Sequence, residues 1–98
     1  MIKKDDWLAE HLNEQLFMNQ PTKEDITQKI KLLFAGELTR EDICNWASAY
    51  IVNDDRILVQ NIDAWHYLVA ISNIDEMISA KDYLFSDEDI QNIMNTYI

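Results

Sequence analysis

The sequence predicts an all-α protein, a compact bundle of four to six short helices joined by short loops. The 98 residues contain one glycine and one proline, whereas sandwiches and barrels need many turn residues. Hydrophobic residues make up 48% of the chain, which is enough for a buried core. A helix-start pattern, Thr or Ser before acidic residues and an isoleucine, occurs at 22–26, 39–43 and 86–90. At this length we expect one domain over residues 1–98.

The first helix is expected to begin after Asp5 or Asp6 and to end near Asn19. Leucines four residues apart give it one apolar stripe, which consists of Leu8, Leu12 and Leu16. Pro21 predicts the end of this helix, because the residue before a proline is disfavoured in helical geometry.

Capping residues predict the second and third helices. A Thr hydroxyl can accept from the backbone N–H of the Asp three residues later, and that carboxylate can accept in return from the Thr N–H. Gly36 stands where a left-handed residue would end the second helix. The turn that follows is short, which predicts a helical hairpin. The third helix is expected to bury Ile43, Trp46, Ala47, Tyr50 and Ile51.

The remaining segments are less regular in pattern. Residues 57–60 fit either an extended connector or a short helical turn. A fourth helix from about Ile62 to Asn73 is apolar around most of its circumference, which predicts a central position. Residues 73–82 fit an extension of that helix, a short helix from Asp75, or a loop pinned by Ile74 and Met77. A last helix follows Ser86 and is expected to bury Ile90, Ile93, Met94 and Tyr97.

The charge balance is strongly acidic, with a net charge of −10 and a pI near 4.3. DNA-binding proteins and proteins of anionic membrane surfaces usually carry the opposite excess. We therefore predict no direct nucleic-acid contact and no membrane partner. No run of residues is apolar enough for a membrane span and the N-terminus lacks a signal-peptide pattern, so a cytoplasmic location is expected. The acidity itself indicates either solubility or a face made for a basic partner.

No motif points to catalysis, a metal or a cofactor. His11 and His66 are far apart in sequence, and the single cysteine, Cys44, falls in the apolar pattern of the third helix, where a buried thiol is expected. The chain lacks paired cysteines of zinc-site spacing and a glycine-rich phosphate loop. We predict that the protein is not an enzyme and has no cofactor.

Acidic pairs at helix ends are the candidate partner interface. Carboxylates favour a helix N-terminus, but Asp54 and Asp55 follow a helix C-terminus, where negative charge is mildly unfavourable. Helix ends gather at the rim of a small bundle, so these groups can merge into one surface with nearby tyrosines as anchors. Core packing is the simpler role for each tyrosine alone. The predicted interface consists of Asp54, Asp55, Asp87, Glu88, Tyr50 and Tyr83.

From about Ile30 onward the chain resembles a group of small acidic bacterial immunity proteins, including those paired with contact-dependent growth inhibition toxins. The similarity rests on the segment 36–42, on Trp46-Ala47, on the 53–55 exit, on Trp65 with Leu68, and on 83–86 with Asp89-Ile90. It implies a cytoplasmic inhibitor that binds the C-terminal domain of a toxin.

We therefore predict an immunity protein that neutralises a basic toxin domain, with a ribonuclease as the favoured class, by covering its active-site cleft. One alternative is a helical adaptor or regulatory module that binds protein and has no toxin partner. Another is a small enzyme or metal protein. The sequence leaves the oligomeric state open.

Overall fold

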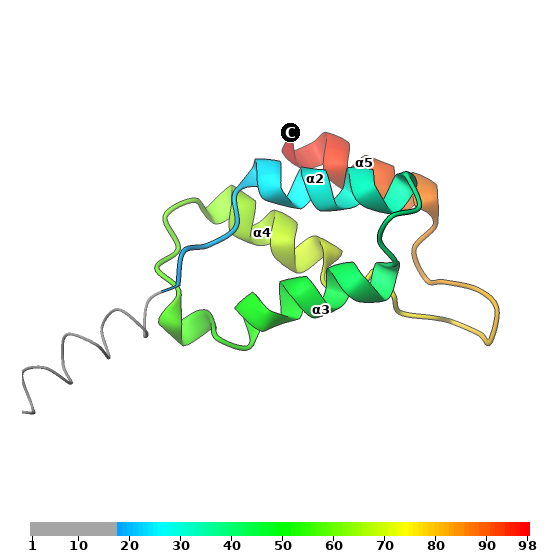
Figure 1. Cartoon of the computed structure of the whole chain (residues 1–98), viewed down its shortest axis with the longest axis horizontal. Helices are drawn as coiled ribbons and strands as arrows, with labels where there is room; N and C mark the ends of the chain where they lie inside the picture. The colour runs from blue at the N-terminus through cyan, green and yellow to red at the C-terminus, as the bar shows by residue number, and fades with distance from the viewer. Residues whose placement is uncertain (1–17) are drawn as a thin grey trace, which may run out of the picture.

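The computed structural model describes residues 18–98 as a bundle of four α-helices and one 3₁₀ turn (Figure 1). In chain order these are α2 (Lys23–Phe34), α3 (Arg40–Ile51), η1 (Asp54–Arg56), α4 (Ile62–Ile71) and α5 (Asp87–Tyr97). The all-α prediction is confirmed. The helix expected to end near Asn19 lies almost entirely outside the described residues, so a single domain over residues 1–98 stays a prediction.

Three reciprocal capping boxes begin α2, α3 and α5. The hydroxyls of Thr22, Thr39 and Ser86 each accept from the backbone N–H three residues later, at 3.0–3.1 Å. The returning carboxylates of Asp25, Asp42 and Asp89 accept from the N-cap N–H groups at 2.9–3.0 Å. At Asp42 the bond from the Thr39 backbone lowers the carboxyl pKa from its ordinary value.

Gly36 ends α2 in a left-handed conformation, with φ of 80°. Its N–H donates to the carbonyl of Leu33 at 3.0 Å, and the N–H of Glu37 donates to the carbonyl of Leu32 at 2.9 Å. This pair of bonds is the Schellman arrangement, which occupies carbonyls left open at a helix end. The chain then turns directly into α3, as the predicted hairpin requires.

Helix α4 packs against α2, α3 and α5 and contributes fully buried Tyr67, Leu68 and Ile71 to the core. The Tyr67 ring stacks on Tyr97 with centroids 5.1 Å apart, and its hydroxyl shares a 2.8 Å hydrogen bond with that of Thr27. The outer face of α4 is open, since Ile62 is 57% exposed. The other buried hydrophobic residues of the core cluster are Ile26, Ile30, Ile43, Cys44, Ala47, Ile74, Ile90 and Met94.

The two ambiguous connections are both non-helical. Residues 57–59 are extended, with Ile57 buried and bridged in parallel to Met18. Residues 72–85 form a loop that projects from the bundle (yellow to orange in Figure 1) and narrows at an antiparallel bridge between Met77 and Tyr83. Fully buried Ile74 anchors this loop. Met77 is 46% exposed, so its expected pinning role is wrong.

None of the helices in residues 18–98 has the length and apolarity needed to cross a bilayer.

Replacing Gly36 by Ala should lower the free energy of unfolding by about 1 kcal/mol, because a side chain strains the left-handed backbone even though the space around it is open. Urea denaturation followed by circular dichroism measures this loss. Asn tolerates the left-handed region better than Ala, so Gly36→Asn is the matched control and should lose less. Equal losses in the two variants would contradict the backbone explanation.

Candidate functional site

Helix α2 is the one described helix whose formal charge is positive. It carries three lysines against two carboxylates, Glu24 and Asp25. Helix α3 has two carboxylates against one arginine, α4 has a single aspartate, and α5 has three carboxylates and no Lys or Arg. Positive charge in the described part of the chain is therefore concentrated on α2, despite the acidic total.

A hollow of about 440 Å³ lies between α2 and the end of α5, and it is lined by Lys23, Glu24, Thr27, Gln28, Lys31 and Ile98. Gln28 and Lys31 are exposed and Lys23 is half-buried. Thr27 points inward to its hydrogen bond with Tyr67. Within residues 18–98 the single salt bridge joins Arg40 to Asp87, so neither Lys23 nor Lys31 is neutralised by a carboxylate there.

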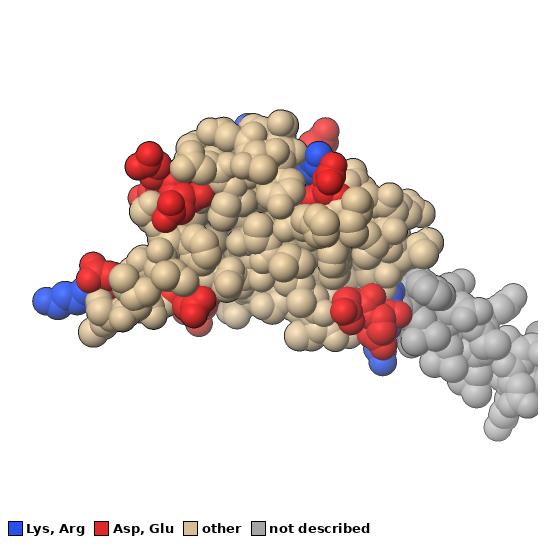
Figure 2. All heavy atoms as spheres, turned by 180° about the vertical axis from the view of Figure 1, so that it is seen from behind, with Lys and Arg blue, Asp and Glu red and all other residues tan. Residues whose placement is uncertain are grey.

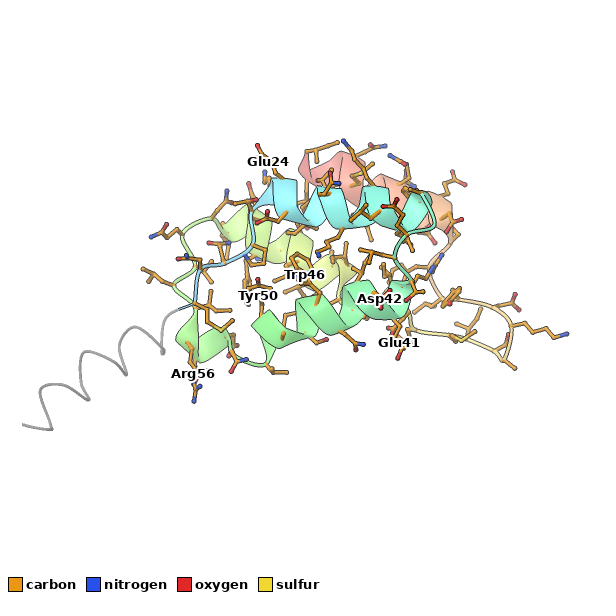
Figure 3. The ribbon with its side chains drawn as sticks, in the orientation of Figure 1. Glu24, Glu41, Asp42, Trp46, Tyr50 and Arg56 are labelled. Atoms are coloured by element: carbon orange, nitrogen blue, oxygen red, sulfur yellow. The ribbon has the colours of Figure 1, made fainter. Side chains whose placement is uncertain are left out.

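The third lysine of α2 lies on the opposite flank of the helix. The Lys29 ammonium is 5.1 Å from the centre of the Trp46 ring, and Trp46 meets the ring of Tyr50 edge-on at 5.6 Å. Figure 3 shows Trp46 and Tyr50 in the space between α2 and α3, with Glu24 at the outer edge of α2. Lys29 thus ties α2 to α3, whereas Lys31 is exposed and Lys23 is half-buried in the first turn of the helix.

A second hollow, of about 670 Å³, lies where the segment 18–24 passes the connector that leads into α4. Gln20 links the two sides of this hollow. Its amide oxygen accepts from the backbone N–H groups of Gln60 and Asn61 at 2.7 and 2.9 Å, and its amide nitrogen donates to the Asn61 carbonyl at 2.9 Å. The lining carries one lysine and one glutamate and no further charge, so it presents no cluster of reactive groups.

The acidic residues predicted as a partner interface are exposed but do not form one surface. Asp87 pairs with Arg40 at the start of α3, whereas Asp54 and Asp55 follow its end, so the length of α3, about 18 Å, separates the two groups. Figure 2 shows the carboxylates of the rear face as separate groups, most of them near its margin, with uncharged side chains between them. The expected merging at one rim does not occur, because the helix ends lie at opposite ends of the bundle.

Both tyrosines of the predicted interface pack against neighbouring side chains. Tyr50 is half-buried against Trp46 and the core, and Tyr83 is 45% exposed with the Arg40 guanidinium 4.0 Å from its ring centre. Glu88 is exposed in the first turn of α5. A role for these residues in binding a partner stays a prediction.

Arg40 is the residue that the sequence analysis missed. It lies in the first turn of α3 but is only 9% exposed. One terminal nitrogen donates to the carbonyls of Ile74 and Phe85, and the other forms the 2.9 Å ion pair with Asp87. An arginine in a helix-start pattern is normally a surface residue. Nothing in the sequence therefore predicts its contact with a loop some 40 positions away.

The described residues offer no metal site, since residues 18–98 contain no group of three or more His, Cys, Asp or Glu side chains placed to hold an ion. Cys44 is buried as expected, and its thiol donates to the Ile71 carbonyl at 3.8 Å. Burial raises the pKa of this thiol to about 11. His66 is exposed on α4, and His11 lies outside the described residues.

Comparisons with known proteins identify a family. The model of the family described as "YxzC DNA-binding protein" matches residues 17–97. An uncharacterized protein YxzC of Bacillus subtilis (strain 168) is 35% identical over 69 residues, which cover 70% of this chain and 56% of that protein. The chain thus spans little more than half the length of this relative. No solved structure is significantly similar to this chain.

This match overturns the resemblance to toxin immunity proteins, and the prediction of a toxin or nuclease partner is wrong. The residues behind that resemblance, such as Gly36, Thr39 and Asp42, cap helices and are needed by many bundles of short helices. The same finding shows that the prediction of no direct nucleic-acid contact is wrong. It rested on the net charge, which averages over the chain and hides the positive balance of α2.

Replacing Arg40 by Met should lower the free energy of unfolding by about 2–3 kcal/mol, because the carbonyl of Ile74 is buried and would lose its donor. Asp87 is 80% exposed, so Asp87→Asn removes the ion pair but should cost about 1 kcal/mol or less. Chemical denaturation of both variants measures the difference. A larger loss for Asp87→Asn would show that the ion pair, and not the carbonyl contacts, carries the stabilisation.

Native protein should react slowly with a thiol-specific disulfide reagent at pH 8, because Cys44 is buried and a thiol with a pKa near 11 remains protonated there. Unfolding in guanidinium chloride should restore the rate of an ordinary thiol. The absorbance of the released thiolate follows both reactions. Fast reaction of the native protein would contradict the burial of Cys44.

Proposed function

Because the chain belongs to the YxzC DNA-binding protein family, we propose that it is a DNA-binding regulatory protein whose α2 helix contacts the DNA backbone. The match to the family over residues 17–97, which include all four described helices, carries the proposal. The positive balance of α2 supports placing the contact on that helix. The proposal is one of binding, without a catalytic step, and a DNA partner implies residence in the cytoplasm.

Lys23 and Lys31 of α2 have the chemistry that a phosphate backbone requires. Lysine ammonium groups neutralise phosphates and release bound counterions, which supplies most sequence-independent affinity. Helix α5 lies beside α2 and runs in the opposite direction (Figure 1), so its acidic first turn is at the far end from Lys23. The last turn of α5, which carries no charged side chain, lies next to Lys23 instead. Lys23 is therefore far from the three carboxylates of α5, and the carboxylates nearest to it in sequence are Glu24 and Asp25.

The small number of cations bounds the strength of this contact. Each neutralised phosphate contributes about −0.9 to the slope of log K against log salt concentration. Two phosphate contacts, by Lys23 and Lys31, therefore imply a slope of roughly −2, far shallower than that of a highly basic repressor. Binding should be modest and confined to low or moderate ionic strength unless several copies act on one DNA.

A second candidate is a helical adaptor or regulatory module that acts through protein contacts within a DNA-associated assembly. The net charge of −10 favours it, as do apolar side chains exposed on the projecting loop, namely Met77, Ile78, Tyr83 and Leu84. The exposed acidic residues Asp87 and Glu88 follow this loop directly and would lie beside such a partner. This candidate predicts no direct binding of DNA by the purified chain.

Fluorescence anisotropy with a labelled mixed-sequence DNA duplex separates the two candidates. Wild-type protein should bind at about 50 mM salt, with the shallow slope derived above. Replacing Lys23 or Lys31 by Gln should reduce that slope by about one unit each and weaken binding to every duplex. Lys81→Gln, on the exposed projecting loop, is the matched control for loss of one charge and should bind like wild type.

Two results would contradict direct DNA binding by α2. One is the absence of any anisotropy change at low salt with the wild-type protein, which would favour the adaptor. The other is an equal loss of affinity in the Lys81→Gln control and the α2 variants, which would show that the loss comes from the overall charge of the protein.

A further inference from the structure

Building on the proposed function, we infer that α2 enters the major groove of duplex DNA, where Gln28 reads a base edge between two phosphate contacts made by Lys23 and Lys31. The contact of Gln28 with a base would give the protein a sequence preference, which contacts with the DNA backbone alone do not provide.

The spacing of the two lysines matches the major groove. They are eight residues apart, which corresponds to about 12 Å along a helix that rises 1.5 Å per residue. The major groove of B-form DNA is about 12 Å wide, whereas the minor groove, at about 6 Å, does not admit a helix. A helix across the major groove can therefore bring one lysine to the phosphates of each strand.

Gln28 lies between these two lysines along α2, about 60° around the helix from Lys31 and about 140° from Lys23. It is exposed and lines the hollow that Lys23 and Lys31 also line. No hydrogen bond within residues 18–98 engages its side-chain amide, in contrast to Thr27, which is held by Tyr67. A glutamine amide matches the N6 donor and N7 acceptor of adenine in the major groove. The residue is thus placed and chemically suited to select adenine.

Glu24 lies one helical turn before Gln28 and is also exposed on this face. Its carboxylate repels phosphates but can accept from the N4 amino group of cytosine, so it favours the floor of the groove over the backbone. Four residues place the two side chains about 6 Å apart along the helix. The pair therefore predicts preference for a cytosine as well as an adenine in the site.

The other helices are poorer candidates for this role. Glu41 and Asp42 are exposed in the first turn of α3, while the arginine of that turn is directed into the protein. Helix α5 begins with three carboxylates, and the exposed face of α4 carries Ile62 and Val69. Among the described helices, only α2 combines cations at both ends with a free amide between them.

Selection from a randomised duplex library, followed by affinity measurements on the enriched and scrambled duplexes, tests this assignment. Wild-type protein should enrich a site with an adenine. Gln28→Ala should reduce the preference for that site by roughly tenfold to a hundredfold while its affinity for scrambled duplex is unchanged. Lys31→Gln should weaken binding to both duplexes equally. Replacing the selected adenine by 7-deazaadenine should reproduce the loss in wild type and have no effect on Gln28→Ala.

The outcomes separate this inference from the proposed function. If wild type binds duplex DNA but Gln28→Ala keeps its full preference, or if single-stranded DNA of the same sequence binds as well as the duplex, the assignment to Gln28 in the major groove is wrong and DNA binding stands. If wild type binds no DNA at low salt, both fall. Ala is a good helix former at this exposed position, and circular dichroism confirms that the variant is folded.

Discussion

The buried guanidinium of Arg40 is the interaction on which the C-terminal half of the bundle depends. Residues 72–85 are a loop with a single bridged pair, so regular backbone pairing cannot hold them in place. Arg40 donates to the carbonyls of Ile74 and Phe85 near the two ends of this loop, and its charge is compensated by Asp87. Burying a cation is tolerated only when its donors find partners, and here the loop backbone supplies them. The first turn of α5 is thereby fixed to the first turn of α3.

This attachment sets the position of α5 and, through it, the inner face of α2. With its start held by Arg40, α5 runs back along α2, and Tyr97 near its end stacks on Tyr67. The hydroxyl of Tyr67 then meets Thr27 on the inner side of α2. These contacts lie on the inner side of α2, and Lys29 meets Trp46 of α3 on one flank. Gln28 and Lys31 are exposed and remain open to a partner.

Local chemistry was predictable from the sequence, and distant contacts were not. The caps at Thr22, Thr39 and Ser86 and the left-handed Gly36 depend on residues within a few positions, so their patterns were sufficient. The burial of Arg40 depends on carbonyls more than 30 residues away, and backbone carbonyls leave no mark in a sequence. The same limit applies to the site. The lysines of α2 are visible in the sequence, but which of them are exposed depends on where Trp46 and α5 pack. The net charge therefore decided the prediction that the protein makes no contact with nucleic acid.

An acidic chain can bind DNA if its negative charge is placed away from the contact. Asp25, Asp42 and Asp89 are engaged in capping bonds at helix N-termini, where the helix dipole stabilises them, so part of the acidity serves the fold. At physiological salt, exposed charges act over a Debye length of about 8 Å, so a carboxylate at the far end of the bundle has little effect on a phosphate held by Lys23. The three carboxylates in the first turn of α5 lie at that far end and repel DNA that approaches there. The acidity then restricts the orientation of the protein on DNA, and α2 is the face that the repulsion leaves available.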